Sequence, residues 1–266
     1  MRIVIINLAS EKARIKFQDR QFKKLGLVYE RFEAIKPKTL PKHIPKSYWQ
    51  TWERPLRPAE RACFLSHYAL WQSILDSNRP ALILEDDVLL SQFLPKILAE
   101  LDALGSNPHG FSHLNLEVTN RKKLVSKPFK ALLAGKIDLL HLYQDRNGAG
   151  AYILWPTGAK TLTEQTQKKS GLVDAVISRT YALNSIQIEP ACAVQFVLCK
   201  PYGLTSPFQT KSATNPSPIM TNDGPLQYMA YKSKRMISQL KLGWRRLNFL
   251  SATRRCIKLR VEDFKF

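Results

Sequence analysis

Three consecutive carboxylates, Glu85, Asp86 and Asp87, follow an apolar run at residues 81–84. A short apolar run of this kind is typical of a strand that is buried on both faces. Side chains alternate along an extended chain, so Glu85 and Asp87 would face one way and Asp86 the other. That pair would offer oxygen ligands to a hard divalent cation carrying phosphates. A solvated acidic turn is the alternative, and a bend after Leu84 would change which two carboxylates share a side.

The segments before the acidic run predict a strand, a helix and a second strand. Residues 2–8 and 27–35 are the predicted strands, and Ser10 can cap a helix over 11–25 that ends at Gly26. This order favours a parallel sheet. Ligands of open α/β sheets bind beyond the carboxyl ends of the strands, which is where the acidic run lies.

A proline-rich stretch over residues 36–58 precedes a helix predicted from Pro58 to about Asn78. Long loops in compact domains tend to be functional or mobile, so the aromatic residues of 45–57 could contact a ligand or could simply pack the loop. The apolar face of the helix includes His67. A histidine on such a face is by default a buried core residue satisfied by a hydrogen bond.

The second half of the chain predicts a further strand at 111–117 and leaves 118–147 without an assignable period. Gly148 and Gly150 then enter a strand, and two glycines permit close backbone approach of a ligand or simply form a turn. Asp174 lies near the positive N-terminal end of a predicted helix. The remaining predicted elements are a helix over 157–167 and one or two strands over 185–198, broken at Pro190.

The chain has 266 residues and a formal net charge of +20, which favours anionic partners such as nucleic acid, an acidic membrane surface or phosphorylated substrates. Its four cysteines lack metal-site spacing and indicate a reduced cytosolic set. The apolar run before Asn7 is too short for a signal peptide. No stretch approaches the roughly 18 apolar residues of a membrane span, so we expect a soluble or peripherally bound cytoplasmic protein.

The C-terminal region has a different composition. Residues 203–225 are rich in Ser, Thr, Pro and Asn, which predicts a flexible connector, and residues 224–261 contain ten basic residues and no acidic one. On a helical wheel Leu240 and Trp244 lie on one side with Met236, Ile237 and Leu247; Lys234, Arg235, Lys241, Arg245 and Arg246 lie opposite, and Leu242 fits neither side. A basic amphipathic helix with a Trp favours an anionic membrane interface. The alternative is a helix packed on the domain with a solvated basic face.

Several segments, in order, resemble glycosyltransferase family 25, the bacterial lipooligosaccharide glycosyltransferases related to the collagen galactosyltransferases. The resemblance covers roughly residues 1–200 and excludes the basic tail. Arg61 and Lys36 depart from the family's usual residues, which concerns substrate detail more than the family. The matching segments are 5–8, 32–35, 56–67 with Cys63, Ser66 and His67, 83–88, 151–154 with 158–160, and 173–174.

The resemblance implies an α/β fold of GT-A type, a Rossmann-like nucleotide-sugar-binding domain with a mostly parallel central sheet, over residues 1–202. The connector over 203–225 and a basic amphipathic segment over 226–266 would follow. It also implies a UDP-sugar donor (most often UDP-galactose), Mn²⁺ or Mg²⁺, and inverting transfer to a lipid-linked, lipooligosaccharide-type acceptor. We therefore expect a bacterial enzyme peripheral on the cytoplasmic face of the inner membrane, with no nucleic-acid partner.

Under this hypothesis Glu85 and Asp87 hold the metal and Asp86 orients donor hydroxyls. An inverting transfer needs a base for the acceptor hydroxyl. Asp174 is the first candidate and Asp145 the second, although an Asp at a helix start need have no chemical role. The other expected substrate-binding residues are Asn7, Arg14, Ser66, His67, Gly148, Gly150 and Tyr152.

Two rival functions use the same features. The net charge and the aromatic residues suggest a nucleic-acid-binding protein, but no recognisable module supports it. A metal-dependent phosphohydrolase could use the acidic run, but it would need more His and Asp ligands than five scattered histidines readily supply.

Overall fold

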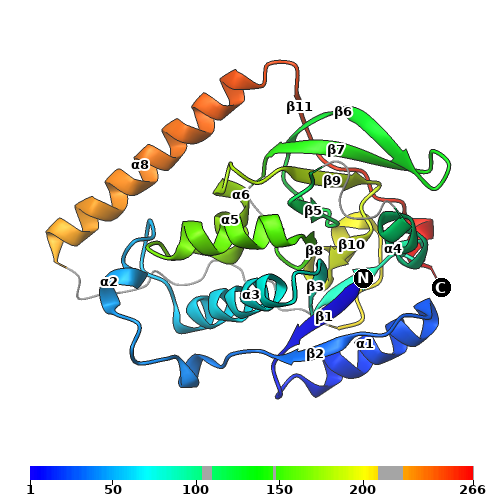
Figure 1. The fold of residues 1–266 in the computed structure, drawn as a ribbon, viewed down its shortest axis with the longest axis horizontal. Helices are drawn as coiled ribbons and strands as arrows, with labels where there is room; N and C mark the ends of the chain where they lie inside the picture. The colour runs from blue at the N-terminus through cyan, green and yellow to red at the C-terminus, as the bar shows by residue number, and fades with distance from the viewer. Residues whose placement is uncertain (104–109, 146–147, 209–223, 266) are drawn as a thin grey trace.

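The structure is a computed structural model that describes residues 1–103, 110–145, 148–208 and 224–265 (Figure 1). Among these residues nine strands form one sheet, and β4 (Val88–Leu90) pairs with β10 (Ala193–Gln195) in a separate antiparallel ribbon. The large sheet consists, in spatial order, of β11 (Thr253–Arg255), β6 (Lys123–Leu132), β7 (Ile137–Gln144), β9 (Ser185–Glu189), β5 (His113–Asn115), β8 (Ala151–Leu154), β3 (Ala81–Glu85), β1 (Arg2–Asn7) and β2 (Glu30–Glu33).

The direction of the strands explains where a binding edge can form. β1 is parallel to both β2 and β3, which confirms the predicted strand-helix-strand opening. In the described part of the sheet β1, β2, β3, β5, β6 and β9 run one way, whereas β7, β8 and β11 run the other way. Six of these nine strands share one direction, and the sheet is mostly parallel in that sense. Because the three reversed strands lie between or beside them, five of the eight neighbouring pairs are antiparallel. The carboxyl ends of β3 and β5 therefore meet at one edge.

The segment without a sequence period forms the β6–β7 hairpin. Its register shifts at three points between Leu124 and Lys130, and Pro128 lies within the strand. Bulges of this kind break the in–out alternation that identifies a strand in a sequence, which is why no strand could be assigned there.

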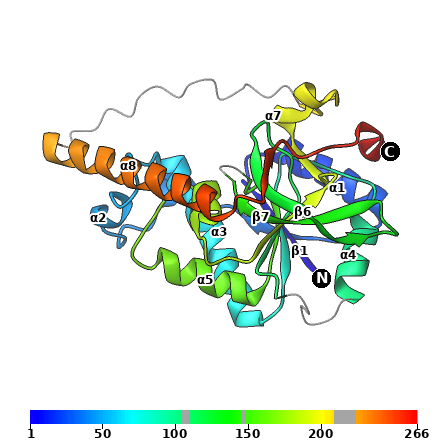
Figure 2. The same ribbon diagram turned by 90° about the horizontal axis from the view of Figure 1, so that it is seen from above.

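Helices cover both faces of the sheet (Figures 1 and 2). Leu82 and Leu84 of β3 pack with Phe22 on one face, and Ile83 packs with Trp71 on the other. The run at 81–84 is thus buried on both faces, as predicted. The described helices are α1 (Lys12–Leu25), α2 (Lys46–Trp49), α3 (Pro58–Ser77), α4 (Leu94–Ala103), α5 (Pro156–Thr166), α6 (Val173–Arg179), α7 (Phe196–Cys199) and α8 (Pro225–Asn248), with short 3₁₀ turns at Pro37–Thr39, Lys200–Tyr202 and Val261–Phe264.

The C-terminal region is a projecting helix followed by a return to the body (Figure 2). Tyr231 and Leu242 of α8 are buried, whereas Leu240 and Trp244 are 66% and 68% exposed. After α8 the chain adds β11 to β6, and Ile257 enters the core. Most of the predicted connector, residues 209–223, lies outside the described residues. In the described part of the chain, no helix has both the length and the apolar character needed to cross a membrane.

Candidate active site

The acidic run lies at the carboxyl end of β3, where the chain turns immediately into β4. Glu85 ends the strand, and Asp86 and Asp87 form the turn. Gln18 of α1 fixes this turn, because its side-chain amide donates to the backbone oxygens of Asp86 and Val88 at 3.0 and 2.8 Å. Asp86 and Glu85 face different neighbours.

Asp86 faces β1 and α1. It accepts hydrogen bonds from Asn7 Nδ2 at 2.6 Å and from Arg14 at 3.0 Å. Burial raises the pKa of Asp86, and the bonds from Asn7 and Arg14 oppose that shift. Asn7, Arg14 and Asp86, all predicted as substrate-binding residues, thus form one polar cluster.

Glu85 faces α3 instead. His67 Nε2 lies 3.4 Å from Glu85 Oε1, and the Cys63 thiol lies 3.8 Å from the same oxygen. The indole N–H of Trp71 donates to the Tyr152 hydroxyl at 2.9 Å, and that hydroxyl lies 2.9 Å from His67 Nδ1. This chain of side chains orients Glu85 from behind.

The other predicted residues of this wall also have structural contacts. Tyr152 is fully buried beneath His67, so it meets the cleft only through that ring. The Ser66 hydroxyl donates to Ala62 O and accepts from the Ile35 backbone N–H, both at 2.9 Å. Ser66 therefore ties α3 to the segment after β2, while its side of α3 lines the cleft.

Glu117 is a fully buried carboxylate and Asp87 is a half-buried one with an enclosed Oδ1, and both have little compensation. Burial, followed by the charge of Glu85, raises the pKa of Asp87 to about 7, with Arg14 acting against the shift. Burial and the charges of Glu85 and Asp87 raise the pKa of Glu117 well above its usual range. Among the described residues Asp87 Oδ1, Glu117 Oε1 and His67 Nε2 are buried atoms without a hydrogen-bond partner. Such atoms are rare in folded proteins and gather here around one cleft.

Glu117 was not among the predicted site residues. It follows β5, whose carboxyl end lies on the same side of the sheet as that of β3. A single acid at the end of an expected strand was the available signal, and it is too common to single out. The backbone N–H of Glu117 is fixed by Asn115 Oδ1 at 2.8 Å.

The two predicted glycines make room for Glu117. A Cβ on Gly150 would lie 2.2 Å from Glu117 Oε1 and 2.6 Å from Gln195 Nε2. Gly148 has a φ of +124°, and a Cβ there would lie 2.5 Å from Asn115 Nδ2. Gly148 also lines the cleft. The close approach that these glycines permit is therefore, in this structure, to side chains of β5 and its continuation.

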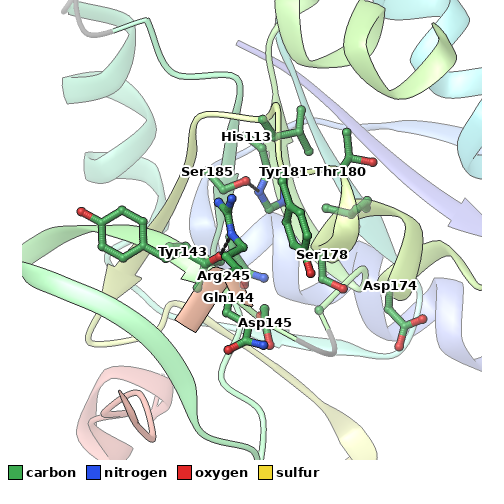
Figure 3. Close-up of a pocket in the computed structure, with 15 residues that line it drawn as sticks. His113, Tyr143, Gln144, Asp145, Asp174, Ser178, Thr180, Tyr181, Ser185 and Arg245 are labelled. Atoms are coloured by element: carbon green, nitrogen blue, oxygen red, sulfur yellow. Dashed lines mark hydrogen bonds between the residues drawn. The ribbon is translucent and has the colours of Figure 1, made fainter. Parts of the chain in front are cut away.

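Asp174 and Asp145 line a small cavity next to the cleft (Figure 3). Asp174 begins α6 and accepts a hydrogen bond from the Ala175 N–H at 2.7 Å. Burial raises the pKa of Asp174 to about 6, with further contributions from Glu85 and Asp145. Asp145 forms a buried ion pair with Lys123 Nζ at 2.7 Å. The two candidate bases thus differ, because Asp145 has a cation beside it.

Most of the predicted residues line, or pack behind, two adjoining cavities that together form the cleft. One part, of about 200 Å³, is lined by Arg14, His67 and all three acids of the turn. A second part, of about 460 Å³, is lined by Glu117, Gly148 and Asp174. Cys63 and Glu85 belong to both parts, so Glu85 stands at their junction.

In open α/β sheets ligands bind beyond the carboxyl ends of the strands, and the carboxylates that follow β3 and β5 lie at such a place, beside the cleft. Residues 1–177 match the family described as "Glycosyltransferase family 25 (LPS biosynthesis protein)". The chain belongs to this family of glycosyltransferases, which confirms the resemblance.

Individual relatives agree with this assignment. The chain is 29% identical over 200 residues to "Lipooligosaccharide biosynthesis protein lic2B" of Haemophilus influenzae, covering 72% of this chain and 74% of the relative. It is 32% identical over 102 residues, 36% of each chain, to "Lacto-N-neotetraose biosynthesis glycosyltransferase LgtB" of Neisseria meningitidis serogroup B. A solved glycosyltransferase "involved in the glycosylation of the major capsid of PBCV-1" matches with a TM-score of 0.37 at 10% identity, over 73% of this chain and 92% of that one, and this match carries no argument.

Proposed function

We propose that this protein transfers a sugar, most simply galactose, from a UDP-sugar to a lipooligosaccharide-type acceptor, with inversion and with the help of a divalent cation. The observation that supports the proposal best is the cleft divided by Glu85, with the acidic turn in one part and Asp174 in the other. The names of the relatives supply the acceptor class. On this proposal the domain is of GT-A type.

Mn²⁺ or Mg²⁺ fits the residues of the turn. Buried carboxylates with raised pKa values, and an unpartnered oxygen on Asp87, are what a hard cation would compensate. Glu85 and Asp87 would hold it. When bound, it would neutralise charge on the diphosphate leaving group. The Cys63 thiol beside Glu85 has a pKa raised by burial and by the charges of Glu85 and Asp174, so it stays protonated and is a poor ligand for such a cation.

The protein's own residues would bind and orient the donor. Arg14 is partly exposed at the cleft and could contact a phosphate oxygen while it holds Asp86. Asp86, fixed by Asn7 and Arg14, is placed to accept from donor hydroxyls. His67, locked by Tyr152, keeps Glu85 in position.

Asp174 is the proposed base. It lies in the part of the cleft beyond Glu85, where an acceptor could enter opposite the diphosphate. A carboxylate with a pKa of about 6 is ionised at neutral pH and is a stronger base than an exposed aspartate. Asp145 is already engaged in a buried ion pair with Lys123, so Asp174 remains the first candidate.

We also propose that α8 holds the enzyme on the cytoplasmic face of the inner membrane, where a lipid-linked acceptor would be. The helix turns Met236, Leu240, Trp244 and Leu247 outward, each more than 60% exposed. Leu242, which fits neither side of the wheel, is buried against the body, as is Tyr231. The outward face is therefore apolar, as a helix in a membrane interface requires.

Screening UDP-sugars for Mn²⁺-dependent hydrolysis, without acceptor, tests the proposed function. We expect one UDP-hexose to be hydrolysed slowly and EDTA to stop the reaction. Cleavage of simple phosphate monoesters, with no UDP-sugar turnover, would instead identify a phosphohydrolase. Salt-sensitive binding of DNA without UDP-sugar hydrolysis would identify a nucleic-acid-binding protein.

A further inference from the structure

A separate groove of about 440 Å³ lies between α8 and the body of the protein. Its walls come from α8, α6, the segment after α5 and the loop around Trp52. Five cationic side chains line it, against one carboxylate, that of Glu53; the five are Lys168, Lys169, Arg179, Lys234 and Lys241. A hollow with this charge excess attracts an anion.

The wall of the groove opposite α8 is tightly built. The Tyr48 hydroxyl donates to Thr166 O at 2.8 Å, and the Ser170 hydroxyl donates to Tyr48 O at 2.8 Å. The Ser170 N–H donates to Thr51 Oγ1 at 2.8 Å. A Cβ on Gly171 would lie 2.7 Å from the Trp52 ring. These contacts hold two distant segments together, so the groove is formed without a ligand.

The cations divide into a fixed pair and an exposed set. Arg179 is fixed by an ion pair with Glu53 and by stacking 4.8 Å above the Trp52 ring, and Lys234 donates to Gln50 O at 2.7 Å. Glu53 balances the charge of Arg179. Lys168, Lys169 and Lys241 are exposed, and no other carboxylate lines the groove.

The groove adjoins the candidate active site through shared lining residues. It shares Thr180 and Tyr181 with the small cavity of Figure 3, and that cavity shares Gly148 and Asp174 with the cleft. Asp174 and Arg179 lie at opposite ends of α6, about 7–8 Å apart along its axis at 1.5 Å per residue. An acceptor whose reacting hydroxyl lies at Asp174 would therefore extend toward the basic groove.

We propose that this groove binds a phosphate group carried by the acceptor glycolipid. The inference rests on the proposed function, because it places the acceptor hydroxyl at Asp174 and the lipid beside α8. Ile237 and Lys241 line the groove at the edge of the outward apolar face of α8, so the groove opens where a lipid-anchored, phosphorylated glycan would leave the bilayer. The position of the groove next to the cavity at Asp174 assigns the phosphate to the acceptor. The outward face of α8 is left to contact the surrounding lipids.

The test replaces the three exposed lysines in the full-length protein. The groove variant is Lys168→Gln, Lys169→Gln and Lys241→Gln. Its matched control is Lys16→Gln, Lys122→Gln and Lys127→Gln, which removes the same charge from exposed positions that line none of these cavities. Binding of mannose 6-phosphate and of mannose is followed by amide NMR shifts, and flotation with phosphatidylglycerol vesicles is measured in parallel.

We expect wild type and control to bind mannose 6-phosphate saturably, with shifts at Ser170 and Lys241, and not to bind mannose. The groove variant should bind it at least roughly tenfold more weakly, since charge-assisted contacts are lost. No saturable binding, or equal binding by the two variants, would refute the proposal. A groove variant that keeps sugar-phosphate binding but loses vesicle binding would assign the groove to bilayer phospholipid and overturn the acceptor assignment.

UDP-sugar hydrolysis without acceptor separates this proposal from the one on which it rests. The groove variant should hydrolyse UDP-sugar at the wild-type rate, because none of the three lysines lines the donor part of the cleft. A wild-type protein that binds mannose 6-phosphate in the groove but hydrolyses no UDP-sugar would refute the proposed function and the acceptor role that depends on it.

Discussion

Asp87, Glu117 and Asp174 have in common a carboxyl group whose pKa is raised chiefly by burial. Burying a carboxylate without a partner is costly, and proteins accept the cost mainly where the group has a chemical task. Arg14 is the cation that acts against the shift at Asp87. The burial of these carboxylates is therefore only partly compensated. A divalent cation would partner the turn, and a reacting hydroxyl would partner Asp174.

The sequence predicted part of this arrangement. Strand alternation separated Asp86 from Glu85, and the structure keeps them apart, but through a turn that directs Asp86 to Asn7 and Arg14. Asp87 also lies in this turn, so strand alternation does not set the direction of its side chain. Glu117 could not be identified, since its importance comes from the meeting of β5 with β3 through β8, which no local pattern encodes.

Replacing Asp174 with Asn should lower the rate of sugar transfer by about 10²-fold or more while sparing UDP binding. In the wild type the base must be ionised, so the transfer rate should fall about tenfold per pH unit below pH 6, near the pKa of Asp174. Steady-state transfer rates across pH 5–8 measure this. A variant with near-normal turnover, or a wild-type profile that is flat down to pH 5, would exclude Asp174 as the base.

The helices hold the site because they pack tightly on the sheet, and α5 shows this best. A Cβ on Gly158 would lie 2.1 Å from the backbone oxygen of Ser112, whereas a Cβ on Gly243 in α8 would meet nothing within 4 Å. Sequence patterns located both helices well. They could not tell which glycine is a packing residue, because that depends on a strand forty residues earlier.

Gly158→Ala should therefore lower the free energy of unfolding by roughly 1–3 kcal/mol, despite the better helix propensity of alanine. Gly243→Ala, the matched change in an open helix position, should raise it by up to about 1 kcal/mol. Urea titration of both variants measures the difference. If both variants changed the free energy of unfolding in the same direction, the close contact of α5 with the backbone before β5 would be contradicted.

Helix α8 was predicted as amphipathic, and the structure adds which side faces out. Burying Leu240 and Trp244 in a bilayer interface would be worth roughly 2 kcal/mol each, so Leu240→Glu with Trp244→Glu should weaken binding to anionic liposomes at least tenfold. Val28→Glu with Phe129→Glu is the control, since these apolar side chains are exposed on other elements. Equal liposome binding by the two variants would mean that α8 does not contact the membrane.

The residues after α8 pack back onto the body of the protein. Ile257 and Phe264 are buried in the core cluster beneath β7 and β10, and the Ala191 N–H donates to Lys258 O at 2.8 Å. The sequence suggested a tail separate from the domain, because three-residue β11 has no recognisable pattern. Deleting residues 226–266 would therefore remove part of the core, and the point variants of α8 are the cleaner test.

The raised pKa of Asp87 should make the free energy of unfolding of the metal-free protein depend on pH. The pKa of Asp87 is about 7 in the folded state against an ordinary value of 3.8, so the folded state binds the extra proton between these values. Stability from this group is present below pH 4 and is lost as pH rises to 7, at up to about 1.4 kcal/mol per pH unit. His113, whose pKa burial lowers to about 3, acts in the opposite direction.

Because of that opposition, the prediction concerns a difference. In EDTA, Asp87→Asn should gain stability relative to wild type steadily from pH 4 to pH 7 and then level off, as measured by chemical unfolding. Mn²⁺ at neutral pH should stabilise the wild type and not the variant. A stability difference that does not change with pH would mean that Asp87 is not a strained buried acid.

The central claim is that the turn at Glu85–Asp87 holds a nucleotide diphosphate through a divalent cation. Calorimetric titration of UDP into the wild type and into Asp87→Ala, each with Mn²⁺ and with EDTA, tests it most directly. The wild type should bind UDP at least roughly tenfold more tightly with Mn²⁺ than with EDTA, and Asp87→Ala should lose that difference while remaining folded. Equal, Mn²⁺-dependent UDP binding by Asp87→Ala would contradict the claim.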